Sequence, residues 1–294
     1  MIVFKQVQDL MAELNNYRSN GFSIAFVPTM GALHQGHISL LEKAHALNTV
    51  IVASIFVNPT QFNEAMDFNK YPKTIEHDVY KLEKAGCDLL FLPSVMEMYP
   101  DGSMLHKTYE LGYLDNLLEG ASRPGHFQGV CQVMERLLSI MEPNNLVLGQ
   151  KDYQQCMVVS KLVSLIGTPI EILIGDTLRE TDGLAMSSRN LRLSYEARTK
   201  APLIYETLVW IKQQLKPGNL KSIKKQATNN LNAGGFKTDY VEIANANSLQ
   251  IVDEWDGQSA LVILVAAFID EIRLIDNLLV LQNTNNKSDQ QTHS

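Results

Sequence analysis

Features of secreted and membrane proteins are scarce in this sequence. Its 294 residues include only three cysteines, which lie far apart and form no CxxC pair: Cys87, Cys131 and Cys156. An odd, scattered set predicts reduced thiols in a core rather than a disulfide framework. No apolar run approaches the ~20 residues of a membrane span, and the first residues soon become polar, which argues against a signal peptide. We therefore expect a cytoplasmic protein with no membrane partner.

Positive charge is also in short supply. The formal net charge is -7, so the chain has no general attraction to nucleic acid, and any phosphate binding must come from a local site. A hydrophobic content of 45% is enough to bury a substantial core, and the length fits one large domain or two modest ones. The expected partner is a small anionic ligand.

What the sequence does contain is an alternation of apolar and helical segments in its first half. The expected strands are Ser23–Val27, Val50–Val57, Asp88–Leu92, Leu146–Leu148 and Ile170–Ile174. The expected helices between them are Leu10–Tyr17, Ile38–Leu47, Ile75–Ala85, Val130–Met141 and Tyr153–Leu165. This alternation predicts an α/β fold, a Rossmann-like doubly wound parallel sheet at residues 1–176.

The pattern changes after about Asp176. Two helical stretches, Tyr195–Gln214 and Leu220–Leu231, precede three short apolar runs at Asp239–Ala244, Ala260–Phe268 and Glu271–Ile275. This order predicts a smaller α+β C-terminal domain at residues 177–283. Residues 284–294 are polar without periodicity, which predicts a disordered tail.

The stretch VPTMGALHQGH, Val27–His37, places two histidines where an expected strand passes into an expected helix. The N–H groups and partial positive charge of a helix N-terminus attract phosphate, and Gly31 and Gly36 allow the backbone to come close. His34 and His37 could hold a triphosphate and donate hydrogen bonds to oxygens that gain charge. Two alternatives are ordinary helix-start residues and, because His-x-x-His also suits zinc, two ligands of a metal site.

Two later segments carry phosphate-binding residue types and also follow expected strands. Lys151 lies in GQKD, and Ser187, Ser188 and Arg189 lie in MSSRN. Arginine offers a planar fork to phosphate oxygens, whereas lysine offers a point charge. Ligands of doubly wound sheets bind beyond the carboxyl ends of the strands. The three segments together predict one nucleotidyl-transfer site, which needs cations and donors rather than a protein nucleophile.

With these three segments, the chain resembles the pantothenate synthetase (pantoate–beta-alanine ligase) family of the HIGH-motif nucleotidyltransferase superfamily. The resemblance extends to about Leu281. It rests on the motifs PTMGALHQGH, SIFVNPTQF, YPKT, LEGASRPGHFQGV, GQKDYQQ, DGLAMSSRN and RLIDN.

The resemblance implies an ATP-dependent condensation of (R)-pantoate with beta-alanine through a pantoyl adenylate. The products are pantothenate, AMP and pyrophosphate. By position, it assigns His37 (the proton donor), His34, Lys151 and Arg189 to catalysis. It assigns ATP binding to Pro28, Thr29, Met30, Gly31, Ala32, Leu33, His34, Gln35, Gly36, His37, Gly149, Gln150, Lys151, Asp152, Leu178, Met186, Ser187, Ser188 and Arg189.

Further assignments concern the acid, the metal and the assembly. Gln61 and Gln155 match pantoate-binding glutamines, whose amides can both donate and accept hydrogen bonds. Asn58 is a lesser candidate for the same pocket. Mg²⁺ is expected on the phosphates, and Asp78 matches a carboxylate linked to it. The family implies a homodimer and a C-terminal domain that closes over ATP.

Three glutamines depart from the common family pattern. They are Gln35, Gln128 and Gln150, which stand where an acid, an arginine and an acid are frequent. None is a residue assigned to pantoate, although charge near ATP would differ.

Three other functions fit the sequence less well than the ligase. Another HIGH-motif adenylyl- or cytidylyltransferase would need cations for a phosphate acceptor, whereas Gln61 and Gln155 suit a carboxylate. A nucleotide-binding module without turnover is opposed by the full set of His34, His37, Lys151 and Arg189. A role like that of an aminoacyl-tRNA synthetase is opposed by the acidic balance.

Overall fold

The computed structural model describes residues 1–47, 49–62, 68, 71–102 and 107–280. The chain forms two compact units, each described by itself below. Unit 1 comprises residues 1–180 and 185–191, and unit 2 comprises residues 181–184 and the described residues from 192 onward. The chain therefore passes between units more than once, whereas the sequence predicted a single boundary after residue 176. The domain roles stay predictions, and the predicted disordered tail lies outside the described residues.

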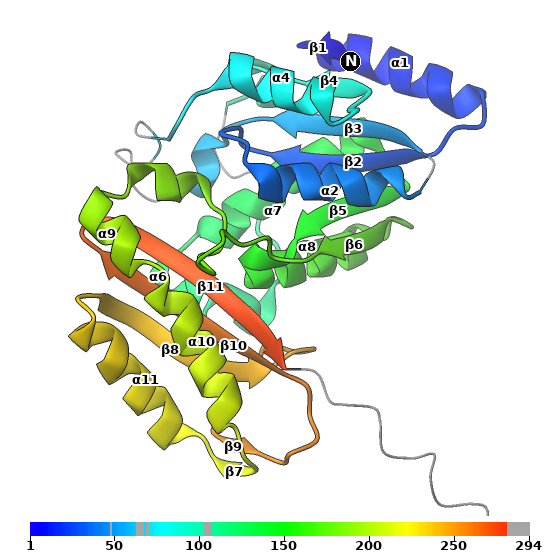
Figure 1. Ribbon diagram of the computed structural model, residues 1–294. Coiled ribbons are helices and arrows are strands. Elements are labelled where there is room, and N and C mark those ends of the chain that lie inside the picture. The colour runs from blue at the N-terminus through cyan, green and yellow to red at the C-terminus, as the bar shows by residue number, and fades with distance from the viewer. Residues whose placement is uncertain (48, 63–67, 69–70, 103–106, 281–294) are drawn as a thin grey trace, which may run out of the picture. The chain divides into compact units, whose positions relative to one another are not determined.

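Unit 1 is built on a six-stranded parallel sheet with the order β1-β4-β3-β2-β5-β6 (Figure 1). The strands are β1 (Ile2–Phe4), β2 (Ile24–Thr29), β3 (Val50–Ile55), β4 (Leu89–Phe91), β5 (Asn145–Gly149) and β6 (Glu171–Gly175). The predicted Rossmann-like parallel sheet is confirmed. The sequence did not indicate β1, whose three residues are held at the sheet edge by pairing with β4.

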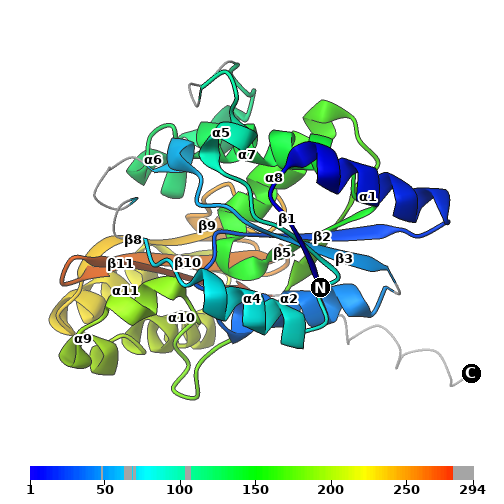
Figure 2. The ribbon, with the colours of Figure 1, turned by 90° about the horizontal axis from the view of Figure 1, so that it is seen from above.

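Helices cover both faces of this sheet (Figure 2). One face carries α2 (Gln35–His45) and α4 (Ile75–Lys84), and the other carries α1 (Val7–Ser19), α7 (His126–Met141) and α8 (Tyr153–Ile166). Unit 1 also contains two short α-helices, α5 (Val95–Met98) and α6 (Glu119–Ser122). Its 3-10 helices are η1 (Pro59–Gln61), η2 (Gly112–Asp115) and η3 (Gln150–Asp152), and η4 (Ser188–Arg192) begins in this unit.

The order of the strands creates a switch point between β2 and β5. From β2 the chain continues through β3 and β4 in one direction, and β5 pairs on the other side of β2 through Phe26 and Leu146. Leu40, Leu41 and Ala44 of α2 are buried in a hydrophobic cluster with residues of the sheet, and this packing holds α2 against the strands. The segments after β2 and β5 therefore leave the sheet side by side, where ligands of such folds bind.

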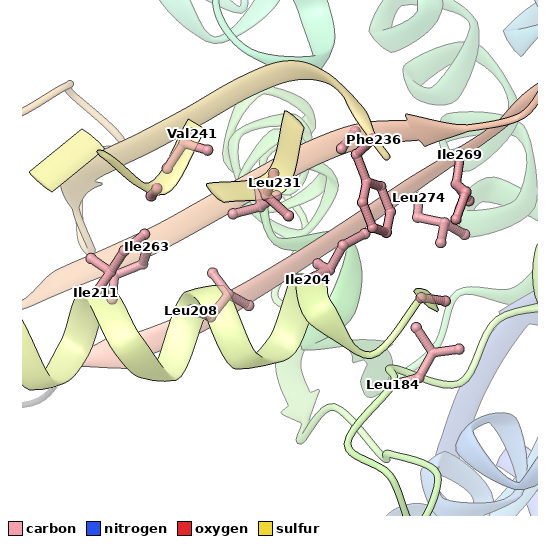
Figure 3. Close-up of a cluster of buried hydrophobic side chains, with 14 of the residues drawn as sticks. Leu184, Ile204, Leu208, Ile211, Leu231, Phe236, Val241, Ile263, Ile269 and Leu274 are labelled. Atoms are coloured by element: carbon pink, nitrogen blue, oxygen red, sulfur yellow. The ribbon is translucent and has the colours of Figure 1, made fainter. Parts of the chain in front are cut away.

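Unit 2 has three helices, α9 (Tyr195–Lys200), α10 (Leu203–Gln214) and α11 (Lys221–Ala233), among its described residues. Its antiparallel sheet has the order β11-β10-β8, with a separate pair β7–β9. The strands are β7 (Gly218–Asn219), β8 (Lys237–Asn245), β9 (Glu254–Trp255), β10 (Leu261–Ile269) and β11 (Ile272–Val280). Figure 3 shows the core between helices and sheet, where Leu208, Leu231 and Ile263 meet.

The prediction of one continuous helix at the start of unit 2 was wrong. The expected helix Tyr195–Gln214 is divided into α9 and α10 at Ala201 and Pro202. Proline lacks the N–H that would continue the helical bonding and is tolerated only at a helix start. No helix among the described residues is long and apolar enough to cross a membrane.

Candidate active site

The first part of the site is the turn from β2 into α2. His34 is the N-cap of α2, and the His34 and His37 rings lie with their centroids 4.1 Å apart. The backbone N–H of His34 donates to Nδ1 of His37 at 3.2 Å. Since Nδ1 accepts, the hydrogen of a neutral His37 is on Nε2. His37 therefore presents an Nε2–H donor.

The electrostatics of the two histidines favour the neutral form. Burial, followed by the charges of His37 and Lys151, lowers the pKa of His34 to about 3. Burial also lowers the pKa of His37 to about 4, with Lys151 and Lys81 as lesser causes. Two neutral imidazoles and neighbouring ammonium groups form a region suited to an anion.

The second part is the turn after β5. Gly149 ends the strand, and Lys151 lies in η3 with its Nζ 3.8 Å from Oδ1 of Asp152. Cys156 on α8 donates its thiol hydrogen to the carbonyl oxygen of Gly149 at 3.2 Å. Burial raises the pKa of this thiol to about 12, so Cys156 stabilises the turn as a neutral group.

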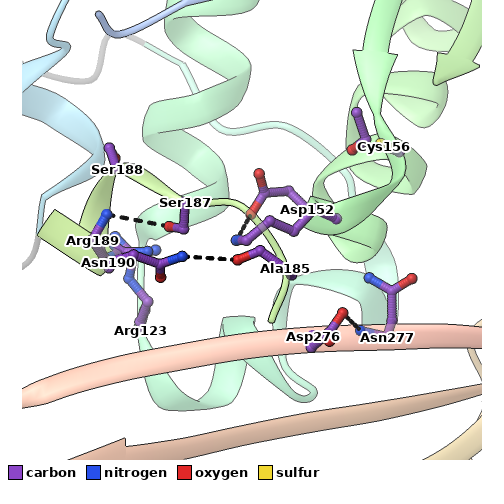
Figure 4. A network of polar contacts seen from close by, with 12 residues as sticks. Arg123, Asp152, Cys156, Ala185, Ser187, Ser188, Arg189, Asn190, Asp276 and Asn277 are labelled. Carbon is purple, nitrogen blue, oxygen red and sulfur yellow. Dashed lines mark hydrogen bonds and ion pairs between the residues drawn. The ribbon is translucent and has the colours of Figure 1, made fainter. Parts of the chain in front are cut away.

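The third part is the segment 185–191 of unit 1. Met186 donates its N–H to the carbonyl oxygen of Leu178 at 3.0 Å, and the N–H of Arg189 donates to Oγ of Ser187 at 3.3 Å. Figure 4 shows Ser187, Ser188 and Arg189 following one another along this segment. A Cβ atom on Gly36 would lie 3.8 Å from Cβ of Met186. The HQGH and MSSRN motifs are thus neighbours, as the sequence led us to expect.

The glutamines expected to bind pantoate differ in their surroundings. Gln61 is buried at the end of η1, where its Oε1 accepts from Nδ2 of Asn58 at 3.2 Å. Asn58 also donates to the carbonyl oxygen of Gly129 and accepts from the Tyr99 hydroxyl, at 3.1 and 2.9 Å. The structure therefore gives Asn58 the task of holding η1 and Gln61. Gln155 is half-buried on α8.

Arg123 and His126 contact Gln61 and were given no role by the sequence analysis. Nδ1 of His126 lies 2.8 Å from the carbonyl oxygen of Gln61, and Nε2 lies 3.2 Å from Nη1 of Arg123. A carbonyl can only accept and a guanidinium only donate, so His126 is neutral with its hydrogen on Nδ1. Burial, followed by Arg123, lowers the pKa of His126 to about 4. The motif LEGASRPGHFQGV was the available signal, but no residue in it was given a role.

Asp78, the carboxylate that the family resemblance linked to Mg²⁺, is buried. It is 1% exposed, and its carboxylate accepts hydrogen bonds from the N–H groups of Ala32 and Leu33. No group of three or more His, Cys, Asp or Glu side chains able to hold a metal ion occurs among the described residues. The zinc alternative for His34 and His37 has no further ligands within the part of the chain that the structure describes.

Gln128, one of the three departures from the family pattern, makes hydrogen bonds to the segment around Tyr109. Gln128 accepts from the N–H of Tyr109 and donates to the carbonyl oxygen of Tyr109 and to Oδ2 of Asp115, at 2.9, 3.1 and 2.7 Å. Its amide therefore ties α7 to the Tyr109 segment. Gln150 is half-buried and Gln35 is exposed.

A parallel sheet that gathers imidazoles, a lysine and a Ser-Ser-Arg segment at its switch point defines a nucleotide-binding α/β enzyme. The family model described as pantoate-beta-alanine ligase matches residues 2–279. The chain belongs to the pantoate–beta-alanine ligase family.

Individual proteins similar to this chain in sequence are named as pantothenate synthetases. The chain is 44% identical to a pantothenate synthetase of Cytophaga hutchinsonii over 96% of this chain and 100% of that protein. A pantothenate synthetase of Pseudomonas fluorescens is 46% identical over 95% of this chain and 97% of that protein.

Solved structures agree as well. The crystal structure of pantothenate synthetase from Thermus thermophilus has a TM-score of 0.86 and 41% identity, covering 96% of this chain and 100% of that one. The pantoate-beta-alanine ligase from Francisella tularensis, complexed with beta-gamma ATP and beta-alanine, has a TM-score of 0.81 and 39% identity. That match covers 95% of this chain and 97% of that one.

Proposed function

We propose that this protein condenses pantoate with beta-alanine, using ATP, to give pantothenate, AMP and pyrophosphate. The observation that carries the proposal is the meeting of the HQGH, GQKD and MSSRN motifs at one switch point in a chain of this family. The complex of the Francisella tularensis relative supports ATP and beta-alanine as substrates. The alternative of another HIGH-motif adenylyl- or cytidylyltransferase is not favoured by the family match.

The first step makes an adenylate. A carboxylate oxygen of pantoate attacks the α-phosphorus of ATP, the bond from this phosphorus to the bridging oxygen breaks, and pyrophosphate leaves. Lys151 and Arg189 offset the charge of the leaving group, and the Nε2–H of His37 donates to an oxygen that gains charge. Because the pKa of His37 is about 4, it acts at neutral pH as a hydrogen-bond donor.

The second step makes the amide. The amine of beta-alanine attacks the acyl carbon, loses a proton, and displaces AMP with the bridging oxygen. Gln61 and Gln155 hold the hydroxyls and carboxylate of pantoate, with Asn58 and His126 keeping Gln61 in place. Positioning of this kind can supply a large part of the rate.

The cation, assembly and location are further proposals. Mg²⁺ would arrive on the triphosphate and neutralise part of its charge. The family resemblance supports a homodimer in the cytoplasm.

The path of oxygen tests the reaction. Pantoate labelled with heavy oxygen in its carboxylate should transfer one labelled atom to AMP, and pyrophosphate-to-ATP exchange should require pantoate but not beta-alanine. Label in inorganic phosphate, with ADP as product, would mean attack on the γ-phosphate and would overturn the adenylate mechanism.

A pair of histidines on α2 tests the site. His37→Ala should lower pantoate-dependent pyrophosphate release by about 10²–10³-fold, the typical loss for one transition-state donor. His45→Ala is the matched control, because His45 lies exposed in the last turn of the same helix. Equal rates in both folded variants would remove His37 from catalysis.

A further inference from the structure

The backbone between β2 and α2 adopts an unfavourable conformation. Gly31 and Ala32 have φ angles of +83° and +50°. Glycine tolerates this region, but an alanine pays about 1–2 kcal/mol for the approach of Cβ to the carbonyl oxygen. Such a conformation persists only where surrounding groups hold it.

Asp78 of α4 is the group that holds it. Its Oδ2 accepts from the N–H of Ala32 at 2.9 Å, and its Oδ1 accepts from the N–H of Leu33 at 2.8 Å. The hydroxyl of Thr74 donates to the same Oδ2 at 3.0 Å. Hydrogen bonds to an ionised carboxylate are stronger than bonds between neutral groups.

Lys81 completes the clamp from the same face of α4. Its Nζ donates to the carbonyl oxygen of Leu33 at 2.5 Å, so the N–H and the C=O of Leu33 are both held by α4. Residues 78 and 81 are neighbours on a helix because they are three positions apart. The next residue after Leu33 is His34, the N-cap of α2, and the charge of Lys81 contributes to the lowered pKa of both His34 and His37.

These contacts disagree with a metal ligand at Asp78. Three of the about four acceptor positions of a carboxylate are taken by protein donors, and the side chain is 1% exposed. Mg²⁺ demands near-octahedral geometry and retains several waters, for which a carboxylate so enclosed offers no room.

We propose that Asp78, together with Lys81, is a positioning residue for adenylation and does not ligate magnesium. It fixes the left-handed backbone at Gly31 and Ala32 and thereby sets the position of His34, His37 and the first N–H groups of α2. This inference rests on the proposed function, because the turn is where we place the triphosphate.

The test compares Asp78→Asn with Asp88→Asn. Asp88 also accepts from a backbone N–H, that of Ile51 at 2.8 Å, but does so at the start of β3. Binding of a non-hydrolysable ATP analogue is measured by calorimetry with and without Mg²⁺, and Mg²⁺ is titrated in the pyrophosphate-release assay.

We expect Asp78→Asn to weaken analogue binding about tenfold or more, by the same factor with and without Mg²⁺. The Mg²⁺ concentration for half-maximal rate should not change, and Asp88→Asn should bind the analogue as the wild type does. A loss seen only with Mg²⁺, with a higher Mg²⁺ requirement, would overturn the proposal in favour of a metal ligand. Unchanged binding by Asp78→Asn would overturn it as well.

Two further measurements distinguish a folding defect and a failure of the proposed function from a failure of the positioning role. If Asp78→Asn does not fold, Lys81→Met removes the other half of the clamp, and it should weaken analogue binding in the same Mg²⁺-independent way. If wild-type protein gives no pantoate-dependent pyrophosphate, the proposed function fails. If the wild type is active and both clamp variants bind normally, only the positioning role fails.

Discussion

At the scale of single residues, the adjacent glutamines Gln154 and Gln155 have different surroundings. Gln154 is buried, accepts from the N–H of Glu119 and donates to the carbonyl oxygens of Leu114 and Leu117, at 3.0, 2.8 and 2.9 Å. Gln155, the next residue on α8, is half-buried and is proposed to bind pantoate. Successive side chains on a helix point in directions about 100° apart. Gln154 can therefore hold the neighbouring backbone while Gln155 points toward the proposed ligand.

This difference makes a matched pair of variants. Gln155→Ala should raise the pantoate concentration needed for half-maximal rate while leaving ATP affinity and stability nearly unchanged. Gln154→Ala should lower the free energy of unfolding by about 1–3 kcal/mol for each buried partner left without a hydrogen bond. Substrate titrations and denaturant unfolding decide it, and an effect of Gln155→Ala on ATP alone would contradict the assignment.

His126 makes the stability depend on pH. Its folded pKa of about 4 lies below the ordinary value of 6.5, so the unfolded chain binds the proton more readily between these values. Unfolding free energy should therefore fall as pH falls below 6.5, by about 2 kcal/mol from this residue at pH 5. His126→Asn should reduce the slope of the profile measured by urea unfolding between pH 7 and 5 by this share, while His34 and His37, whose pKa values are also lowered, keep theirs. A profile as steep as that of the wild type would show that other groups cause it.

At the scale of elements, the close approach of α7 to η1 depends on a glycine. A Cβ atom on Gly129 would lie 2.2 Å from the carbonyl oxygen of Thr60, which is backbone and cannot move aside cheaply. The same approach places the carbonyl oxygen of Gly129 in contact with Asn58, and Asn58 in contact with Gln61. The packing of α7 and the proposed pantoate pocket are therefore linked at Gly129.

Gly129→Ala should both destabilise the protein, by about 1–3 kcal/mol as for other overpacked sites, and raise the pantoate requirement. Gly167→Ala is the control, because Gly167 has a φ of +68° but no atom within 4 Å of an added Cβ. It should cost about 1–2 kcal/mol through backbone strain alone and leave the pantoate titration unchanged. Equal pantoate requirements in the two variants would separate α7 packing from substrate binding.

At the scale of the whole molecule, the segment 179–190 belongs to unit 1, then to unit 2, then to unit 1 again. A segment with residues in both units, and with residues proposed to bind phosphate at its end, is suited to respond to the nucleotide. Backbone amides in residues 179–190 should exchange hydrogen more slowly when a non-hydrolysable ATP analogue is added. Exchange in α11 serves as the control, and unchanged exchange in 179–190 would indicate a preformed site.

The sequence by itself determined the parallel sheet, because long buried apolar runs alternating with amphipathic helices have few other ways to bury their surface. It also indicated where the His, Lys and Ser-Ser-Arg residues gather, because strand ends of such a sheet share one edge. Only the tertiary structure showed the hydrogen-bond partners of Asp78, His126 and Asn58. Each acts through hydrogen bonds to backbone groups on other elements, Asp78 to Ala32 and Leu33 across 45 or more residues, and no local pattern encodes such partners. The break between α9 and α10 could have been predicted from the sequence, because Pro202 cannot continue a helix. Strand β1 could not, because its three residues form a strand only by pairing with β4.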